Sequence, residues 1–409
     1  MARPGAAETR AFSLVNPPEG FVDDPYPWYA ALRAHDPVHA LGPESVFLTR
    51  YDDVLAVYRS RDASSDKKVE FRPKFGDSPL YEHHTTSLVF SDPPLHTRVR
   101  RIIMGALNQR AIVRMEEQVV TLVDRLLDDL AAKGKADFIE DFAARIPIEV
   151  IGNLLGVPHA DRGPLRGWSI AILSGLEPVP TPAMLEAGNR AVAEFVEYLK
   201  GLVAERRRSP GDPEVDVLTR LIQGETAGEH SGERLTELEL VHNCIFMLNA
   251  GHETTTNLIG NGLWLLMTHP GEFARLRADP ALLAPAVEEM LRYEGPIQLN
   301  NRRLTAPHEI GGRTLPAGTF VTLGIGAANR DPAQFPDAER FDVGRKPNRH
   351  VAFGQGDHAC SGMNVARMEG RVALGRLLAR FRTIEPAGAP ERDRRIRFRG
   401  FRHLPVRVA

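Results

Sequence analysis

The stretch F-G-Q-G-D-H-A-C-S-G, from Phe353 to Gly362, is the most informative part of this 409-residue chain. Glycines at positions 354 and 356 permit a tight backbone turn that a side chain would block. Cys360 stands just before a helical pattern, and the N-terminus of a helix favours a thiolate. A thiolate is a soft iron ligand that pushes electron density toward O–O cleavage. The stretch therefore predicts a cysteine that can bind a metal as its thiolate, and the alternative is a buried structural cysteine in a glycine-rich turn.

The longest helical pattern runs from about Thr236 to Met267 and stops before Pro270. Its length is typical of a helix that crosses the middle of a large domain. At its centre, A-G-H-E-T-T places Glu253 beside Thr254 in an otherwise apolar helix. Burying such a pair is costly unless water or function satisfies it, and the pair can relay protons. The alternatives are a polar face turned to solvent and a zinc protease helix, which Thr256 excludes because a second His is required there.

Composition narrows the class of protein. Hydrophobic residues make up 43% and charged residues 25%, as in ordinary globular proteins. Lys and Arg total 51 against 53 Asp and Glu, so nothing demands nucleic acid or an anionic membrane as partner. With only two cysteines, a disulfide framework is implausible. The first twenty residues lack an apolar segment and no window is long enough to span a membrane, so we expect a cytoplasmic protein without a signal peptide.

The chain reads as an α+β protein that is predominantly helical. We expect a loose arm over residues 1–20 and a single domain over 21–409. Residues 63–91 contain Pro, Gly, Ser and two adjacent histidines without a steady period, so they are predicted to form a long loop. The other patterns predict helices at Trp28–Arg33 and Asp53–Tyr58, a strand at Val46–Thr49, mostly helices from 95 to 295, short strands between 296 and 350, and a hairpin in the tail from Arg394.

The cysteine stretch resembles the heme-binding signature of the cytochromes P-450, F-x-x-G-x-x-x-C-x-G. The fixed positions are filled by Phe353, Gly356, Cys360 and Gly362. The centre of the long helix is similar to the family motif A/G-G-x-D/E-T, through Ala250, Gly251, Glu253 and Thr254. The motifs follow the order of the family over nearly the whole chain.

The resemblance implies the cytochrome P-450 fold, with a long central helix and small β-sheets, and heme b with Cys360 as the iron ligand. It implies that Phe353 packs on the heme, that Gly251 leaves room for dioxygen, and that Glu253 and Thr254 manage protons. One departure is Ser361, where bacterial members usually carry Leu or Ile. Its hydroxyl is expected to donate a hydrogen bond to the sulfur and raise the iron potential.

Two further sets of residues match the family in order and spacing. Glu289 and Arg292 lie three apart on one helix face and can pair. The resemblance implies a structural ion-pair network that holds the cysteine loop, with Arg340 as its third member. It also implies that the heme propionates bind several cations, because buried carboxylates need charged or strong donors. Those residues are His96, Arg100, Arg302 and His358, with Arg303 as an alternative to its neighbour.

The family topology indicates an apolar substrate pocket in which amides orient a polar substrate group or else bond the backbone. The residues expected to line it are Leu88, Val89, Phe246, Asn249, Leu299, Asn300 and Phe401, with Gln298 as a further amide. The implied activity is insertion of one oxygen atom from dioxygen into an organic substrate. The alternatives are desaturation, oxidative coupling or a non-catalytic heme sensor. Electrons are expected from a separate ferredoxin or flavodoxin, docked on a basic face formed by Arg98, Arg101, Arg110, Arg345, Lys346 and Arg349.

Overall fold

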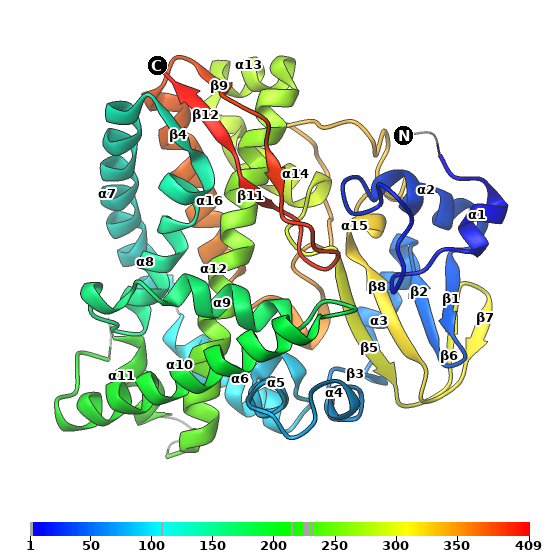
Figure 1. Ribbon diagram of the computed structural model, residues 1–409, viewed down its shortest axis with the longest axis horizontal. Coiled ribbons are helices and arrows are strands. Elements are labelled where there is room, and N and C mark those ends of the chain that lie inside the picture. Colours follow the sequence, from blue (N-terminus) through cyan, green and yellow to red (C-terminus); the bar gives the residue numbers. More distant parts are fainter. Residues whose placement is uncertain (1–2, 108, 214–215, 225–229, 231) are drawn as a thin grey trace.

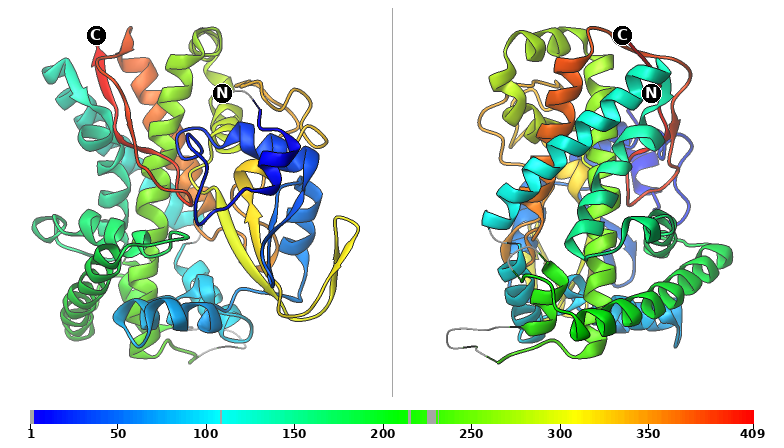
Figure 2. Two further views of the ribbon diagram at one scale, coloured as in Figure 1. Left: turned by 45° about the vertical axis from the view of Figure 1, so that its right-hand side comes forward. Right: turned by 90° about the vertical axis from the view of Figure 1, so that its left-hand side faces the viewer.

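The computed structural model describes residues 3–107, 109–213, 216–224, 230 and 232–409, and its central element is α12 (Glu237–Thr268). The Thr236 hydroxyl accepts from the Glu239 N–H at 3.2 Å, while the Glu239 carboxylate accepts from the Thr236 N–H at 2.8 Å. This reciprocal cap satisfies two N–H groups that the helix itself leaves free. Figure 1 shows α12 running through the molecule, and Figure 2 shows the same course from two further sides. The predicted long central helix is confirmed.

Helices surround α12. Those in contact with it are α5 (Pro79–Thr86), α8 (Arg145–Leu154), α9 (Leu165–Ser174), α10 (Pro182–Arg208), α13 (Pro270–Ala278), α14 (Leu283–Tyr293) and α16 (Met363–Arg380). The π-helical turn η2 (Ile139–Ala143) also contacts α12, whereas α6 (Leu95–Ala106), α7 (Gln109–Lys133) and α11 (Val217–Gln223) lie further out. From Leu240 to Leu263, α12 is buried except at Phe246, Ala250, Gly251 and Thr254.

A five-stranded sheet stands beside the helices in the order β1-β2-β8-β5-β3 (Figure 1). Only the β2–β8 pair of this sheet is parallel. Its strands are β1 (Val38–Gly42), β2 (Ser45–Leu48), β3 (Ala63–Ser64), β5 (Leu299–Leu304) and β8 (Phe320–Gly324), accompanied by α2 (Tyr26–His35), α3 (Tyr51–Arg59) and α15 (Ile325–Ala328). The smaller sheets are β4 (Lys135–Asp137) with β12 (Pro405–Val408) and β9 (Ile384–Pro386), β6 (His308–Ile310) with β7 (Arg313–Leu315), and β10 (Glu391–Arg392) with β11 (Phe401–His403). The predominantly helical α+β architecture is confirmed.

The segment 63–91 is not the long loop that we predicted. It contains β3, α4 (Lys68–Phe75), α5 and the short turn η1 (Leu88–Phe90). Ser78 caps α5 by accepting from the Tyr81 N–H at 3.4 Å, and Pro79 occupies the first helical position, where no N–H is needed. Each helix has only eight residues. The sequence shows no clear helical period here, because so few apolar positions recur in such short helices. Buried histidines also occupy positions that a polarity pattern assigns to solvent.

The N-terminal segment is ordered rather than loose over much of its length. Residues Ala6–Arg10 form α1, and Phe12 and Leu14 are buried. The ring of Phe12 packs against Phe21 and Phe47, with centroids 5.1 and 6.1 Å apart. This burial of apolar side chains corrects the expectation of a loose arm. Within the described part of the chain, no helix combines the length and the apolar character that crossing a membrane requires.

Candidate active site

The cysteine loop places the thiol of Cys360 just before α16. Gly354 and Gly356 have φ angles of +66° and +70°, and a Cβ on Gly356 would stand 2.5 Å from the Tyr58 carbonyl oxygen. The turn therefore requires glycine there. The Cys360 N–H donates to the Phe353 carbonyl at 2.8 Å, which closes the loop. Cys360 is partly exposed, whereas Cys244 is fully buried. Of the two cysteines, the one in this loop is therefore the more exposed.

The surroundings of Cys360 combine burial with positive groups. Burial raises the pKa of the thiol, and the Gly362 N–H, Arg100 and Arg367 oppose that shift. The same groups stabilise a thiolate, the form that binds a metal. Arg367 also lies over the Phe353 ring, 4.7 Å from its centroid, and pairs with Glu288 at 2.7 Å. Phe353 is therefore held against the loop, as the expected proximal packing requires.

Beside the loop lies a cluster of basic groups that we name the basic cradle: Lys67, His96, Arg100, Arg302 and His358. The rings of His96 and His358 have centroids 3.9 Å apart. His96 is buried, and neither of its ring nitrogens has a hydrogen-bond partner in the described structure. Such a concentration of donors is costly without an anion nearby. The cradle therefore fits the two carboxylates of the expected heme.

Electrostatics point to the same ligand. Burial, followed by the neighbouring cation Arg302, lowers the pKa of His358 to about 2 and that of Lys67 to about 7. An opposite charge within a few ångströms favours the protonated form of each group. The cradle is thus poised to gain positive charge when it takes up carboxylates, which strengthens its hold on them.

Lys67 is the member of the cradle that sequence reasoning missed. It is only 2% exposed, and its Nζ lies 3.5 Å from the carbonyl oxygens of both Ser64 and Asp66. A lysine that precedes another lysine in a stretch without periodicity gives no signal that it is buried. Arg303, the alternative to Arg302, is engaged elsewhere, because its Nε donates to Glu70 at 2.6 Å.

Ser361 adjoins the cradle as well as the sulfur. Arg100 Nη1 donates to the Ser361 hydroxyl oxygen at 2.9 Å. The hydroxyl oxygen therefore acts as an acceptor toward Arg100, and its own proton remains available to another group. The expected hydrogen bond from Ser361 to the sulfur stays a prediction.

Glu253 and Thr254 point in different directions from α12. The Thr254 hydroxyl donates to the Ala250 carbonyl at 2.6 Å and is partly exposed. With Phe246 and Ala250 it forms what we call the open stripe, three residues spaced by four on one helix face. Glu253 is instead buried and pairs with Arg395 from the C-terminal segment. The acid thus links the stripe to a different part of the chain.

The expectation that Gly251 leaves room for dioxygen stays a prediction, and the structure gives this glycine a further role. A Cβ on Gly251 would stand 2.8 Å from Ile151 Cδ1, so this glycine faces α8. Its role is to let the two helices approach closely, as small residues do. Ala250, which is exposed, is the small residue on the open stripe.

Glu253, Arg395 and Asp393 form a polar cluster that extends from α12 to the partly exposed Asp393. Arg395 pairs with both Glu253 and Asp393, and burial raises the pKa of Asp393 to about 6. Within the described residues, Glu253 Oε2, Arg395 Nη1 and both ring nitrogens of His252 have no hydrogen-bond partner. Buried polar atoms of this kind are commonly satisfied by water. The arrangement suits passage of protons from Asp393 toward the stripe.

The ion-pair network on α14 differs from the predicted one in its third member. Arg292 donates to both Glu289 oxygens at 2.7 and 2.8 Å, and both side chains are fully buried. The third cation is Arg345, not Arg340. The Arg340 side chain is 63% exposed, and only its carbonyl oxygen accepts from Arg292, at 3.1 Å. The sequence motif indicated the right segment of the chain, but it could not show that the side chain of Arg345, and not that of Arg340, points toward Glu289.

The structure separates the predicted pocket residues into two groups. Phe246 lies on the open stripe and Asn249 precedes Ala250 directly. The Leu88 N–H donates to Asn243 Oδ1 at 2.9 Å, which fixes Leu88 and its partly exposed neighbour Val89 against α12. These four residues therefore lie near the stripe.

Three predicted pocket residues lie away from the open stripe, and their place in the substrate pocket stays a prediction. Leu299 is buried in the cluster around Phe12 and Phe47. Asn300 is bound to the Tyr58 hydroxyl at 3.3 Å, on the face of β5 that carries Arg302. Phe401 packs on Trp264 with ring centroids 5.6 Å apart, at the far end of α12 from Phe246. The alternation of β5 and the path of the tail decide these positions, and neither is readable from motif order.

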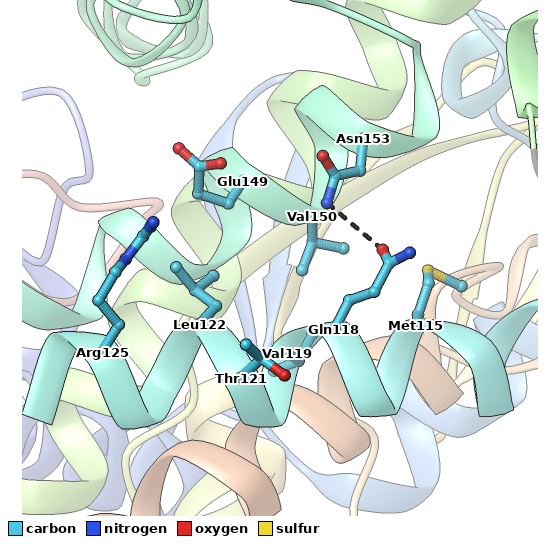
Figure 3. A pocket seen from close by; sticks show the side chains of 9 residues that line it. All are labelled: Met115, Gln118, Val119, Thr121, Leu122, Arg125, Glu149, Val150 and Asn153. Carbon is cyan, nitrogen blue, oxygen red and sulfur yellow. Dashed lines mark hydrogen bonds between the residues drawn. The ribbon is translucent and has the colours of Figure 1, made fainter. Parts of the chain in front are cut away.

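A separate hollow lies between α7 and α8 (Figure 3). Asn153 donates to Gln118 Oε1 across it at 3.4 Å, and Arg125 and Glu149 stand at one end. Its lining includes no member of the cysteine loop, the cradle or the open stripe. We therefore place the active site at the cysteine loop and not in this hollow.

Comparison with known proteins gives consistent results. The family model described as "Cytochrome P450" matches residues 171–400. Cytochrome P450 107B1 of Saccharopolyspora erythraea is 37% identical, over 95% of this chain and 96% of that protein. The 6-deoxyerythronolide B hydroxylase of the same organism is 38% identical, over 95% and 97%. The crystal structure of P450BioI in complex with hexadec-9Z-enoic acid ligated acyl carrier protein has a TM-score of 0.89 and 32% identity, covering 96% of this chain and all of that one.

Proposed function

Because this chain belongs to the cytochrome P450 family, we propose that it inserts one atom of dioxygen into a small, mainly apolar organic substrate, using heme b and electrons from a separate ferredoxin or flavodoxin. The broader activity, that of an oxygen-incorporating oxidoreductase, follows from its hydroxylase and monooxygenase relatives.

One observation carries the proposal. A partly exposed Cys360, beside a cradle of five basic groups, lies at the start of a helix that packs against α12. The donor set offers a thiolate for iron and cations for carboxylates, which are the two kinds of polar contact that heme presents. Lys67, His96, Arg100, Arg302 and His358 would hold the carboxylates, and Phe353 would pack on the ring.

Heme, when bound, supplies the iron centre at which dioxygen is activated. The residues of this chain handle the protons. The Thr254 hydroxyl holds a proton on the open stripe, next to the small side chain of Ala250. The Glu253 Oε2 atom, which Arg395 leaves unbonded, can take a proton from the Asp393 side and turn toward the stripe. A positioned acid of this kind contributes about 10²- to 10⁴-fold to rate.

The substrate is expected to be apolar over most of its surface, because Phe246, Val89 and Leu88 form the described wall near the stripe. Relatives include a hydroxylase of 6-deoxyerythronolide B, and a structural neighbour binds an acyl chain on a carrier protein. Large, mainly apolar molecules are therefore suitable first candidates.

Electrons are proposed to enter from a separate protein at the cysteine side. The docking face needs revision, because the Arg345 side chain is only 10% exposed and pairs with the buried Glu289. Arg98 and Arg101 also engage acids, Glu239 and Glu233. The Arg110 side chain lies outside the described residues. Lys346 and Arg349 remain candidates for contact with an acidic partner.

The test begins with the purified, heme-loaded protein. Reduction and carbon monoxide should give the red-shifted Soret band of a thiolate-ligated heme, and Cys360→His should abolish it while heme is retained. A folded, heme-loaded protein without that band would contradict the proposal. Candidate substrates are then screened by the absorbance change that accompanies loss of iron-bound water, and hits are incubated with a ferredoxin and its reductase to look for oxygenated product.

A further inference from the structure

Arg100 is a cation beside the cysteine loop whose charge is not balanced locally by an acid. On the same helix, α6, Arg98 pairs with Glu239 at 2.5 Å. Within the described part of the chain, no ion pair joins Arg100 to a carboxylate, and its guanidinium donates to one neutral acceptor, the Ser361 hydroxyl oxygen, at 2.9 Å. The positive charge of Arg100 can therefore act on the groups that lie next to it.

The group on which this charge acts most directly is Cys360. Ser361 follows Cys360 in the chain, so the hydrogen bond from Arg100 holds the guanidinium next to the cysteine. Burial lowers the pKa of Arg100, and Cys360 opposes that shift more strongly than Asp357 does. The guanidinium and the sulfur thus lie close enough to interact through their charges.

A second cation near the sulfur, Arg367, is already neutralised. Its Nε and Nη2 atoms donate to the two carboxylate oxygens of Glu288 at 2.7 and 2.8 Å. A bidentate pair of this kind places a negative charge directly against the guanidinium and so reduces its effect on the sulfur. Of the two arginines that act on Cys360, Arg100 is therefore the one with an uncompensated charge.

The position of Arg100 is shared between the sulfur and the basic cradle. Burial, followed by Arg100, lowers the pKa of His96, so the guanidinium also lies close to that ring. A carboxylate bound in the cradle is a stronger acceptor for Arg100 than a hydroxyl is. Without an acceptor at position 361, Arg100 would therefore be free to turn away from the sulfur. The Ser361 hydroxyl opposes that movement, because it binds one of the two terminal nitrogens of the guanidinium.

We infer that Ser361 is a positioning residue that holds Arg100 beside the sulfur and thereby raises the reduction potential of the iron bound there. Ser361 acts through Arg100 and needs no hydrogen bond of its own to the sulfur. This inference rests on the proposed function, because it requires Cys360 as the iron ligand.

The direction of the effect follows from charge. Reduction of the ferric site adds one electron from the donor protein and no proton, so the site becomes more negative by one charge. A fixed cation next to the sulfur stabilises the reduced form more than the oxidised form. The pair of Ser361 and Arg100 therefore makes the first electron transfer to the enzyme more favourable.

The test is an anaerobic redox titration of the heme-loaded, substrate-free protein and its variants. Ser361→Ala removes the acceptor and should lower the equilibrium constant of reduction about tenfold, which is about 59 mV for one electron. Ser361→Thr keeps a hydroxyl and should restore the wild-type potential. Arg98→Met is the matched control on the same helix and should leave the potential unchanged, because Glu239 already balances that charge.

A double variant separates action through Arg100 from direct action on the sulfur. Arg100→Met should lower the potential at least as much as Ser361→Ala does. In the Arg100→Met background, Ser361→Ala should add no further shift, because no guanidinium remains to be held. An equal shift in both backgrounds would show that the hydroxyl bonds the sulfur itself and would overturn the inference. An unchanged potential in Ser361→Ala, or an equal shift in Arg98→Met, would overturn it as well.

Resonance Raman spectroscopy of the ferric protein gives a second readout that does not depend on activity. The iron–sulfur stretching frequency should rise in Ser361→Ala, because a sulfur without a neighbouring cation donates more electron density to iron. The same frequency in variant and wild type would count against the role of Ser361. The carbon monoxide band separates this outcome from failure of the proposed function. A wild type without the red-shifted band would refute thiolate ligation, whereas a normal band in every variant with unchanged potentials would refute only the positioning role.

Discussion

Arg345 Nε lies 3.1 Å from Oε1 of Glu289, a side chain that is fully buried. The same carboxylate receives Arg292 at 2.7 Å and the Asn348 amide at 3.2 Å. One acid on α14 is thereby bound to two cations and an amide, two of them from the segment that leads into the cysteine loop. The network stabilises the loop because a buried carboxylate is expensive unless it is fully paired.

Replacing Arg345 should therefore weaken the protein far more than replacing Arg340. Arg345→Met removes one partner of a buried charge and should lower the free energy of unfolding by roughly 2–4 kcal/mol. Arg340→Met alters a mostly exposed side chain and should change it by at most about 0.5 kcal/mol. Urea unfolding followed by circular dichroism measures both. Equal losses in the two variants would show that Arg345 is not the third member of the network.

Lys67 should contribute to heme retention through the heme carboxylates. Lys67→Met removes a buried cation of the basic cradle and should speed heme loss to an acceptor protein by about tenfold, the effect of one charge-assisted hydrogen bond. Reconstitution with the dimethyl ester of heme removes the carboxylates and should erase the difference between variant and wild type. Lys68→Met, at a 58% exposed side chain, is the control. An undiminished difference with the ester would place Lys67 outside the carboxylate contacts.

The sequence predicted the chemistry of this site better than its geometry. The cysteine loop could be predicted because its requirements are local. The glycine needed for a positive φ at position 356 and the sulfur ahead of a helix lie within a few residues of each other in the sequence. Arg395 could not be found in this way, since its contact with Glu253 joins segments far apart in the chain. Lys67 was hidden for a different reason. Burial of a polar side chain depends on tertiary packing, which a pattern of polarity does not reveal.

The pairing of Glu253 with Arg395 predicts a coupled effect on stability and turnover. Glu253→Gln and Arg395→Met each leave the other group buried without its partner. The double variant should therefore lose less free energy of unfolding than the two single variants lose together, by a coupling energy of about 0.5–3 kcal/mol. Glu253→Gln should also reduce product formation by about 10²-fold, because the amide cannot carry the proton. Product formed per electron consumed is the second measurement. Additive stabilities together with normal coupling of electrons to product would dismiss the relay.

Glu369 on α16 provides a pH dependence that does not involve the iron site. Its side chain is 2% exposed beside Thr255, and burial raises its pKa from 4.5 to about 8. Between these values the unfolded chain loses the proton while the folded chain keeps it, so stability falls as pH rises. The slope approaches about 1.4 kcal/mol per pH unit at most.

Glu369→Gln should remove that slope, because the amide stays neutral in both states. The free energy of unfolding of the variant, relative to that of the wild type, is therefore expected to rise steadily from pH 5 to about 8. Urea unfolding at each pH measures it. Glu385→Gln, at an exposed position, should leave the wild-type slope unchanged. Parallel pH profiles for Glu369→Gln and the wild type would mean that Glu369 is ionised in the folded protein, because only a retained proton makes stability fall over this range.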